Sequence, residues 1–124
     1  MILENFYTIE NKSVDENMEN YSYEIYINSE HDIFKGHFPG NPVMPGVCMM
    51  QIIKEISQTI TGQKLFMEKC SNVKFLALIN PETNPKLTVD LKIIEQDGKV
   101  KVRNITKFED TVALRLSAQY KRVE

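Results

Sequence analysis

The sequence has no tryptophan, only two cysteines, no long apolar run and no excess of positive charge. Cys48 and Cys70 cannot build a disulfide framework, and no CxxC pair or paired histidines accompany them as metal ligands. We therefore expect both thiols to be buried or half-buried, as free cysteines usually are. No stretch approaches the roughly 18–20 apolar residues that a membrane-spanning helix requires, so no span is predicted.

The charge balance argues against another class of function. The formal net charge is −2, and the lysines and arginines are scattered, so we expect no nucleic-acid partner. The first residues, MILENFYTIE, lack the basic start and apolar core of a secretory signal, and a cytoplasmic protein is expected. No nucleotide or metal motif is present, and we expect no cofactor. The 124 residues of ordinary composition predict one domain over residues 1–124.

Alternating apolar and polar residues predict six strands. Two precede the central region, NFYTIE and YSYEIYIN, and four follow residue 62: SNVKFLALIN, KLTVDLKIIEQ, KVKVRNITKFE and TVALRLSAQYKRV. In the second strand, Tyr21, Tyr23, Ile25 and Ile27 share one face, because side chains alternate with period two. Asp97-Gly98 predicts a type I′ hairpin. FEDTV predicts a second tight connection between strands.

One helix is predicted, over residues 47–61, with the sequence VCMMQIIKEISQTIT and a natural stop at Gly62. Its apolar residues leave only a narrow polar stripe, so the helix should be buried. A single apolar helix needs a sheet that curls around it, or a partner chain that covers the remainder. The sequence therefore predicts an α+β architecture, in which a curved, mostly antiparallel sheet wraps around one long buried helix.

The loop before this helix carries the most specific pattern. GHFPGNPVMPGV, residues 36–47, resembles the signature GHFPxxPVxPGV of the 3-hydroxyacyl-acyl-carrier-protein dehydratases. The matching residues are His37, Phe38, Pro39, Pro42, Val43, Pro45, Gly46 and Val47. The resemblance implies the hotdog fold and an acyl carrier protein bearing a 3-hydroxyacyl thioester as the partner. It also implies a homodimer or a trimer of dimers, in which the histidine and the helix-borne acid come from different subunits.

Dehydration of a 3-hydroxyacyl thioester requires removal of a C2 proton and protonation of the departing hydroxyl. His37 suits the first task, because the unperturbed pKa of histidine is about 6.5. Phe38, Pro39, Gly46 and Val47 are the expected substrate-binding residues. The amides near Gly46 begin a helix and can polarise the thioester carbonyl. The resemblance implies that the acyl chain lies in a tunnel beside this helix.

The catalytic acid departs from the family pattern. Fourteen residues after His37 the family has glutamate or aspartate, whereas this chain has Gln51, whose amide cannot release a proton at physiological pH. Glu55 lies one turn further along the same helix face, about 6 Å away. Two interpretations stay open. Either Glu55 supplies the acid in place of residue 51, or it is a charged residue at the rim, beside Lys54 or Gln58.

A second departure is VKFLALINP, residues 73–81, where the family commonly has KFxxPVxPGD. Lys74 and Phe75 match, but Ala77, Leu78 and Ile79 are apolar, and we expect a subunit interface there. Lys35 is a candidate contact for an acidic carrier protein. His31 has no comparable context and is expected to be a solvated loop residue.

Three functions compete at this level. The first is a dehydratase of fatty-acid or polyene-type synthesis that gives a trans-2-enoyl thioester, with His37 as the base and Gln51 or Glu55 at the hydroxyl. The second is a non-catalytic acyl-binding or partner subunit, which Gln51 favours. The third is a thioesterase on the same fold, and the complete loop signature argues against it.

Overall fold

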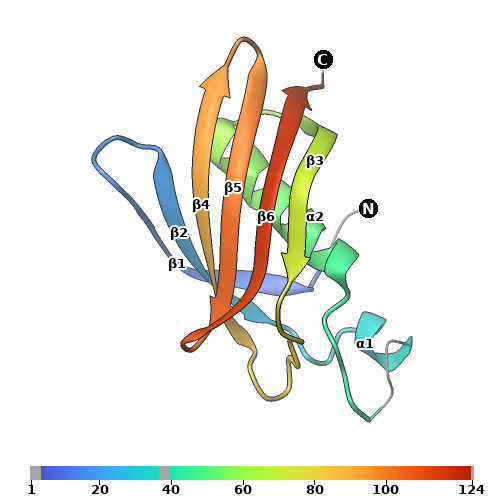
Figure 1. Ribbon diagram of the computed structural model, residues 1–124. Helices are drawn as coiled ribbons and strands as arrows, with labels where there is room; N and C mark the ends of the chain where they lie inside the picture. The colour runs from blue at the N-terminus through green and yellow to red at the C-terminus, as the bar shows by residue number, and fades with distance from the viewer. Residues whose placement is uncertain (1–3, 37–39, 124) are drawn as a thin grey trace.

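The computed structural model describes residues 4–36 and 40–123. It contains one six-stranded sheet and two helices (Figure 1). In chain order they are β1 (Tyr7–Val14), β2 (Asn20–Ile27), α1 (Ile33–Gly36), α2 (Gly46–Thr61), β3 (Leu65–Phe75), β4 (Lys86–Gln96), β5 (Lys99–Phe108) and β6 (Thr111–Arg122). The strands are arranged β1-β2-β4-β5-β6-β3, and every neighbouring pair is antiparallel. The predicted α+β class is confirmed.

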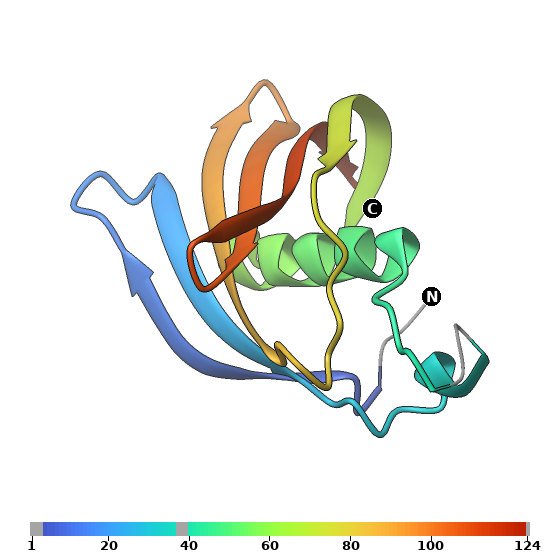
Figure 2. The same cartoon turned by 60° about the horizontal axis from the view of Figure 1, so that its bottom comes forward.

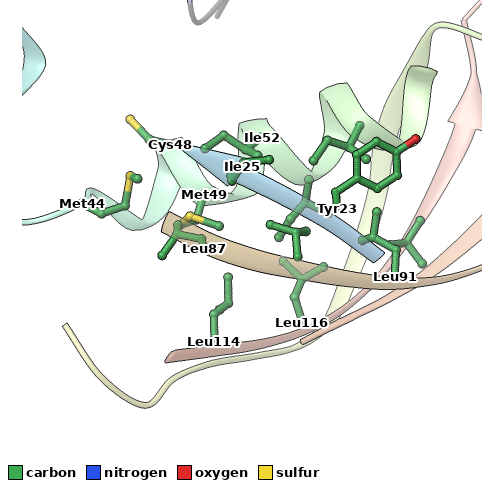
Figure 3. Close-up of a cluster of buried hydrophobic side chains, with 14 of the residues drawn as sticks. Tyr23, Ile25, Met44, Cys48, Met49, Ile52, Leu87, Leu91, Leu114 and Leu116 are labelled. Atoms are coloured by element: carbon green, nitrogen blue, oxygen red, sulfur yellow. The ribbon is translucent and has the colours of Figure 1, made fainter. Parts of the chain in front are cut away.

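The sheet curves around α2, which lies along its concave side (Figure 2). Residues Cys48, Met49, Ile52, Ile53 and Ile56 of the helix are almost fully buried. They meet apolar side chains of the sheet, including Ile25 of β2, Leu87 of β4 and Leu114 of β6 (Figure 3). The apolar helix and the alternating strands therefore form one core, as the sequence predicts for a hotdog fold.

Short-range signals set the ends of these elements. Gly62 has a left-handed φ of 68°, and its N–H donates to the carbonyl of Gln58, which closes the last turn of α2. Asp97 and Gly98 both have positive φ, 53° and 75°, as a type I′ hairpin requires. Glu109, with φ 53°, makes the predicted tight connection between β5 and β6. All three turns are confirmed.

The strand β3 departs from the prediction in its position. It covers Leu65–Phe75, whereas the sequence predicted a strand over residues 71–80. The first half of β3 does not alternate regularly between apolar and polar residues, so the sequence pattern misses it. The reason is that the pairing of β3 with β6 shifts register twice, between Met67 and Lys69 and between Cys70 and Asn72. The short helix α1 was also not predicted. Residues 76–80 form a connecting segment instead of continuing the strand.

The two cysteines have different environments. Cys48 is fully buried in α2, and burial raises the pKa of its thiol. Cys70 is exposed on β3, so the expectation that both thiols are buried or half-buried is wrong for this residue. Cys70 lies on an edge strand between the two register shifts of the β3–β6 pairing, and its side chain is left uncovered there.

No helix within residues 4–36 and 40–123 has the length and apolar character needed to cross a membrane.

Candidate functional site

The signature loop leads into the N-terminus of α2. His37, Phe38 and Pro39 lie outside the described residues, and their expected roles stay predictions. The N-cap residue of α2 is Pro45, whose side chain makes no capping hydrogen bond. Because the first N–H groups of a helix have no acceptor within it, those of Gly46 and Val47 require one from outside. This end of α2 can therefore bind a carbonyl oxygen or an anion.

An aromatic ring covers the glycine at this position. A Cβ atom added to Gly46 would lie 2.7 Å from Cζ of Phe75, which is closer than real Cβ atoms approach. The ring of Phe75 therefore packs directly on the helix backbone, and only glycine leaves room for it. Val47 is 66 % exposed beside it. The matched residues Gly46 and Phe75, 29 positions apart in the sequence, thus meet at one place.

The apolar segment after Phe75 is held in place but partly open. Met44 donates its N–H to the carbonyl of Ile79 (2.8 Å), and Leu76 donates to Ala113 (2.8 Å). Ile79 is buried, whereas Leu76 and Leu78 are exposed. Phe75, which packs on the start of α2, and the residues Val47, Leu76 and Leu78 near it in the sequence are all exposed apolar residues, here together called the entry patch. Such a surface is typical of an interaction site.

A polar network lies on α2 beyond its first turn. The amide Nε2 of Gln51 donates to Oε2 of Glu55 over 3.0 Å, and both side chains are half-buried. The structure therefore brings together the two residues that the sequence singled out on this helix face. Both interpretations of Glu55, as the acid and as a rim residue, stay predictions. Gln58 accepts a hydrogen bond from the N–H of Leu65.

Sequence reasoning missed the third member of this network. The hydroxyl of Tyr7, at the start of β1, donates to Oε1 of Glu55 over 3.0 Å. Burial, and then the negative charge of Glu55, raises the pKa of Tyr7 far above its ordinary value, so the hydroxyl stays protonated and acts as a donor. Tyr7 lies 48 residues before Glu55, and no local spacing relates the two positions.

The second histidine has a structural role. His31 was expected to be solvated, but it is half-buried, with its ring edge-on to Phe6 at 5.1 Å between centroids. Its Nδ1 accepts a hydrogen bond from the N–H of Ile33. Its Nε2 lies 3.0 Å from the carbonyl oxygen of Glu4, which accepts a hydrogen bond from it. These bonds fix His31 at the start of α1.

Lys35, the candidate carrier-protein contact, is exposed and forms an ion pair with Asp32.

Among the described residues, no group of three or more histidine, cysteine, aspartate or glutamate side chains lies close enough together to hold a metal ion.

Comparison with known proteins supports the resemblance of the signature loop. Residues 12–117 match the model of the ApeI-like family, described as ApeI dehydratase. The chain is 32 % identical over 96 residues to the 3-hydroxyacyl-[acyl-carrier-protein] dehydratase FabZ of Lactobacillus helveticus, covering 72 % of this chain and 63 % of the relative. It is 31 % identical over 102 residues to the FabZ of Lactococcus lactis subsp. cremoris, covering 77 % and 66 %. The chain thus spans just under two thirds of these relatives' lengths.

The fold has a counterpart among solved structures. The dehydratase heterocomplex ApeI:P from Xenorhabdus doucetiae contains a chain that superimposes with a TM-score of 0.76 at 21 % identity, over 93 % of this chain and 97 % of that one. That similarity confirms the predicted fold, with a curved antiparallel sheet around one helix. The family match extends across α2 and five of the six strands in full or in large part. The chain belongs to the ApeI-like dehydratase family.

Proposed function

We propose that this protein is a 3-hydroxyacyl-thioester dehydratase. It removes water from a 3-hydroxyacyl group on an acyl carrier protein and leaves a trans-2-enoyl thioester. The observation that carries this proposal is the hydrogen-bonded pair Gln51–Glu55 on an otherwise apolar helix, just beyond an N-terminus that can polarise a carbonyl. The FabZ relatives, which are named for this reaction, support it.

The proposed reaction assigns one task to each end of the site. The N–H groups of Gly46 and Val47 bind the thioester oxygen, where negative charge develops as C2 loses its proton. His37 takes that proton, the C2–C3 double bond forms, and the C3–O bond breaks. The departing hydroxyl accepts a proton and leaves as water. Gln51 hydrogen-bonds this hydroxyl, and Glu55, the carboxyl group of the network, is the proposed source of the proton.

The proposed assembly is a homodimer, with a trimer of dimers as its higher form. Within the described chain β3 pairs with β6 alone, so its other edge is open to a strand from a second copy. The entry patch adjoins the end of this strand and supplies apolar area for such an interface. A Leu78→Asp variant should be monomeric in light scattering after gel filtration, whereas Lys69→Asp, on the exposed middle of β3, tests the strand edge separately.

The cytoplasm is the proposed location. Both cysteines are free thiols in the structure, which suits a reducing compartment.

One experiment tests the activity and the acid together. Purified protein is incubated with a 3-hydroxyacyl carrier protein, and formation of the enoyl product is followed for the wild type, His37→Ala, Glu55→Gln and Gln51→Glu. The proposal expects turnover that His37→Ala and Glu55→Gln each reduce at least about 100-fold. Loss in His37→Ala but full activity in Glu55→Gln would remove Glu55 from the reaction. Release of free acid and thiol would show a thioesterase instead.

A second candidate function is a non-catalytic partner subunit. Two observations favour it: residue 51 is a neutral amide, and the structural neighbour from Xenorhabdus doucetiae is described as a heterocomplex. Under this candidate the wild type alone would show no turnover, while Gln51→Glu would gain it. When this protein is mixed with an active dehydratase homologue from its own organism, the turnover rate of that homologue or the size of its assembly should then change.

A further inference from the structure

The hydroxyl of Tyr7 is not accounted for by the proposed reaction. It belongs to β1, whereas Glu55 and Gln51 belong to α2, so the hydrogen bond to Glu55 joins two separate elements. Oε1 of Glu55 accepts from Tyr7 and Oε2 accepts from Gln51, both at 3.0 Å. Three side chains are thus connected in a row from the sheet to the proposed substrate position.

The direction of each bond in this row follows from its geometry. The Tyr7 hydroxyl stays protonated and donates to Oε1 of Glu55, and Nε2 of Gln51 donates to Oε2, so the carboxyl group accepts both bonds. Gln51 must therefore turn its NH₂ group toward Glu55. The amide is planar, so its carbonyl oxygen faces the opposite side, and one N–H is left in addition. A glutamine that flipped its amide would place two acceptor oxygens together, which is unfavourable.

Tyr7 is attached to a rigid part of the sheet. The residue before it, Phe6, is fully buried, and the carbonyl of Phe6 accepts the N–H of Asn28 over 2.8 Å. Tyr7 itself pairs with Ile27 at the start of the β1–β2 ladder. The ring of Tyr7 is half-buried and packs against the core. A carboxylate on a helix has several rotamers, and a hydroxyl held by the sheet selects one of them.

We propose that Tyr7 is a positioning residue for the dehydration site: acting through Glu55, it sets the orientation of the Gln51 amide that meets the 3-hydroxyl of the substrate. This inference rests on the proposed function for its consequence in catalysis. The orientation itself is a property of the free protein. With its NH₂ group turned to Glu55, Gln51 presents its carbonyl oxygen to the substrate hydroxyl, which donates to it and exposes the lone pairs that accept the proton.

The test uses two readouts on Tyr7→Phe, with Tyr120→Phe as the matched control. Both variants remove one buried or half-buried tyrosine hydroxyl, but Tyr120 has no hydrogen-bond partner for its hydroxyl among the described residues. The first readout is the side-chain NH₂ signal of Gln51 in a ¹⁵N correlation spectrum, assigned by its disappearance in Gln51→Glu. We expect Tyr7→Phe to move or broaden this signal and Tyr120→Phe to leave it in place.

The second readout is steady-state kinetics with a 3-hydroxyacyl carrier protein. Tyr7→Phe should lower kcat about tenfold and change KM less than about twofold, because a misoriented amide affects the reacting geometry more than binding. Tyr120→Phe should keep the wild-type kcat. An unchanged Gln51 signal in Tyr7→Phe overturns the proposed link, whatever the kinetics show. A moved signal with an unchanged kcat overturns the positioning role in catalysis.

These outcomes separate this inference from the proposed function. If the wild type has no dehydratase activity with any 3-hydroxyacyl carrier protein, the proposed function fails, and the Gln51 signal still decides whether Tyr7 orients the amide. If the wild type is active and Tyr7→Phe resembles Tyr120→Phe in both readouts, the proposed function stands and the role of Tyr7 is rejected.

Discussion

Tyrosine has opposite environments at the start of β1 and in the interior beside β6. At the start of β1, Tyr7 is half-buried, and its hydroxyl donates to the carboxylate of Glu55. On β6, Tyr120 is fully buried, and its hydroxyl has no partner among the described residues. Burial raises the pKa of both side chains; the charge of Glu55 adds to this at Tyr7, and Cys70 adds to it at Tyr120.

The difference separates two uses of tyrosine. At Tyr120 the ring fills space in the core, and the hydroxyl contributes nothing that the structure shows. At Tyr7 the ring is only partly covered, and the hydroxyl makes the contact that distinguishes the position. A buried polar group without a partner costs free energy, whereas one bonded to a charged group is stabilising. We therefore expect removal of the ring to lower the free energy of unfolding more at Tyr120 than at Tyr7. Removal of the hydroxyl alone should lower it more at Tyr7 than at Tyr120.

The largest effect is expected for the ring of Tyr120. Tyr120→Ala leaves a cavity at a fully buried position and should lower the free energy of unfolding by about 3–5 kcal/mol, the range for large aromatic residues. Urea denaturation followed by circular dichroism measures the change. Tyr7→Ala provides the comparison, and an equal loss there would contradict the assignment of Tyr120 as the space-filling residue.

The next effect concerns the hydroxyl alone. Tyr7→Phe should lower the free energy of unfolding by about 1–2 kcal/mol, because it removes a hydrogen bond to a carboxylate from a half-buried position. Tyr120→Phe should change it by less than about 0.5 kcal/mol, or raise it, because no bond is lost. The same denaturation experiment compares the two variants. A larger loss in Tyr120→Phe would reverse the comparison and indicate a partner for that hydroxyl.

A smaller quantity is the coupling between Tyr7 and Glu55. In a double-mutant cycle of Tyr7→Phe and Glu55→Gln, the interaction energy should be about 0.5–1.5 kcal/mol, since the two side chains are in direct contact. The cycle of Tyr120→Phe with Glu55→Gln should be additive to within about 0.3–0.5 kcal/mol. Additivity in both cycles would mean that the Tyr7–Glu55 bond contributes no net stability.

The smallest effect appears at alkaline pH. The pKa values of Tyr7 and Tyr120 are raised in the folded protein above the ordinary value of about 10 that the unfolded chain retains. The folded state therefore keeps these protons to higher pH than the unfolded chain does. Below about pH 10 the two groups should cause no change of the free energy of unfolding with pH, and above it the free energy of unfolding should fall as pH rises. Tyr7→Phe and Tyr120→Phe should each reduce this slope in denaturation curves. Tyr23, whose pKa is also raised, accounts for part of what remains.

Much of the fold could be predicted because the decisive signals are local. Gly62 ends α2, Asp97-Gly98 turns the β4–β5 hairpin, and the apolar circumference of the helix requires a sheet around it. The bounds of β3 could not be predicted, because two register shifts break its alternation. The exposure of Cys70 could not be predicted either, because only the order of the strands in the sheet shows that β3 is at its edge.

The candidate site was predictable only where one helix contains it. Gln51 and Glu55 lie four residues apart, so helical geometry alone places them together. Tyr7 reaches Glu55 across 48 residues, and only the path of β1 below the helix, as seen in Figure 2, brings it there. The contact between Gly46 and Phe75 is likewise tertiary, although both residues match family positions. The role of His37, the residue with the strongest sequence argument, lies outside the described residues and stays a prediction.

The packing of Phe75 on Gly46 has an evolutionary consequence. A side chain at position 46 and an aromatic ring at position 75 cannot occupy the same space, because the first atom beyond Cα would already stand 2.7 Å from the ring. The two positions should therefore change together: relatives that keep the ring keep the glycine, and those that gain alanine at 46 have a smaller residue at 75. A lineage can thus change the apolar cover at the start of α2 by exchanging one pair of residues, without altering the rest of the helix.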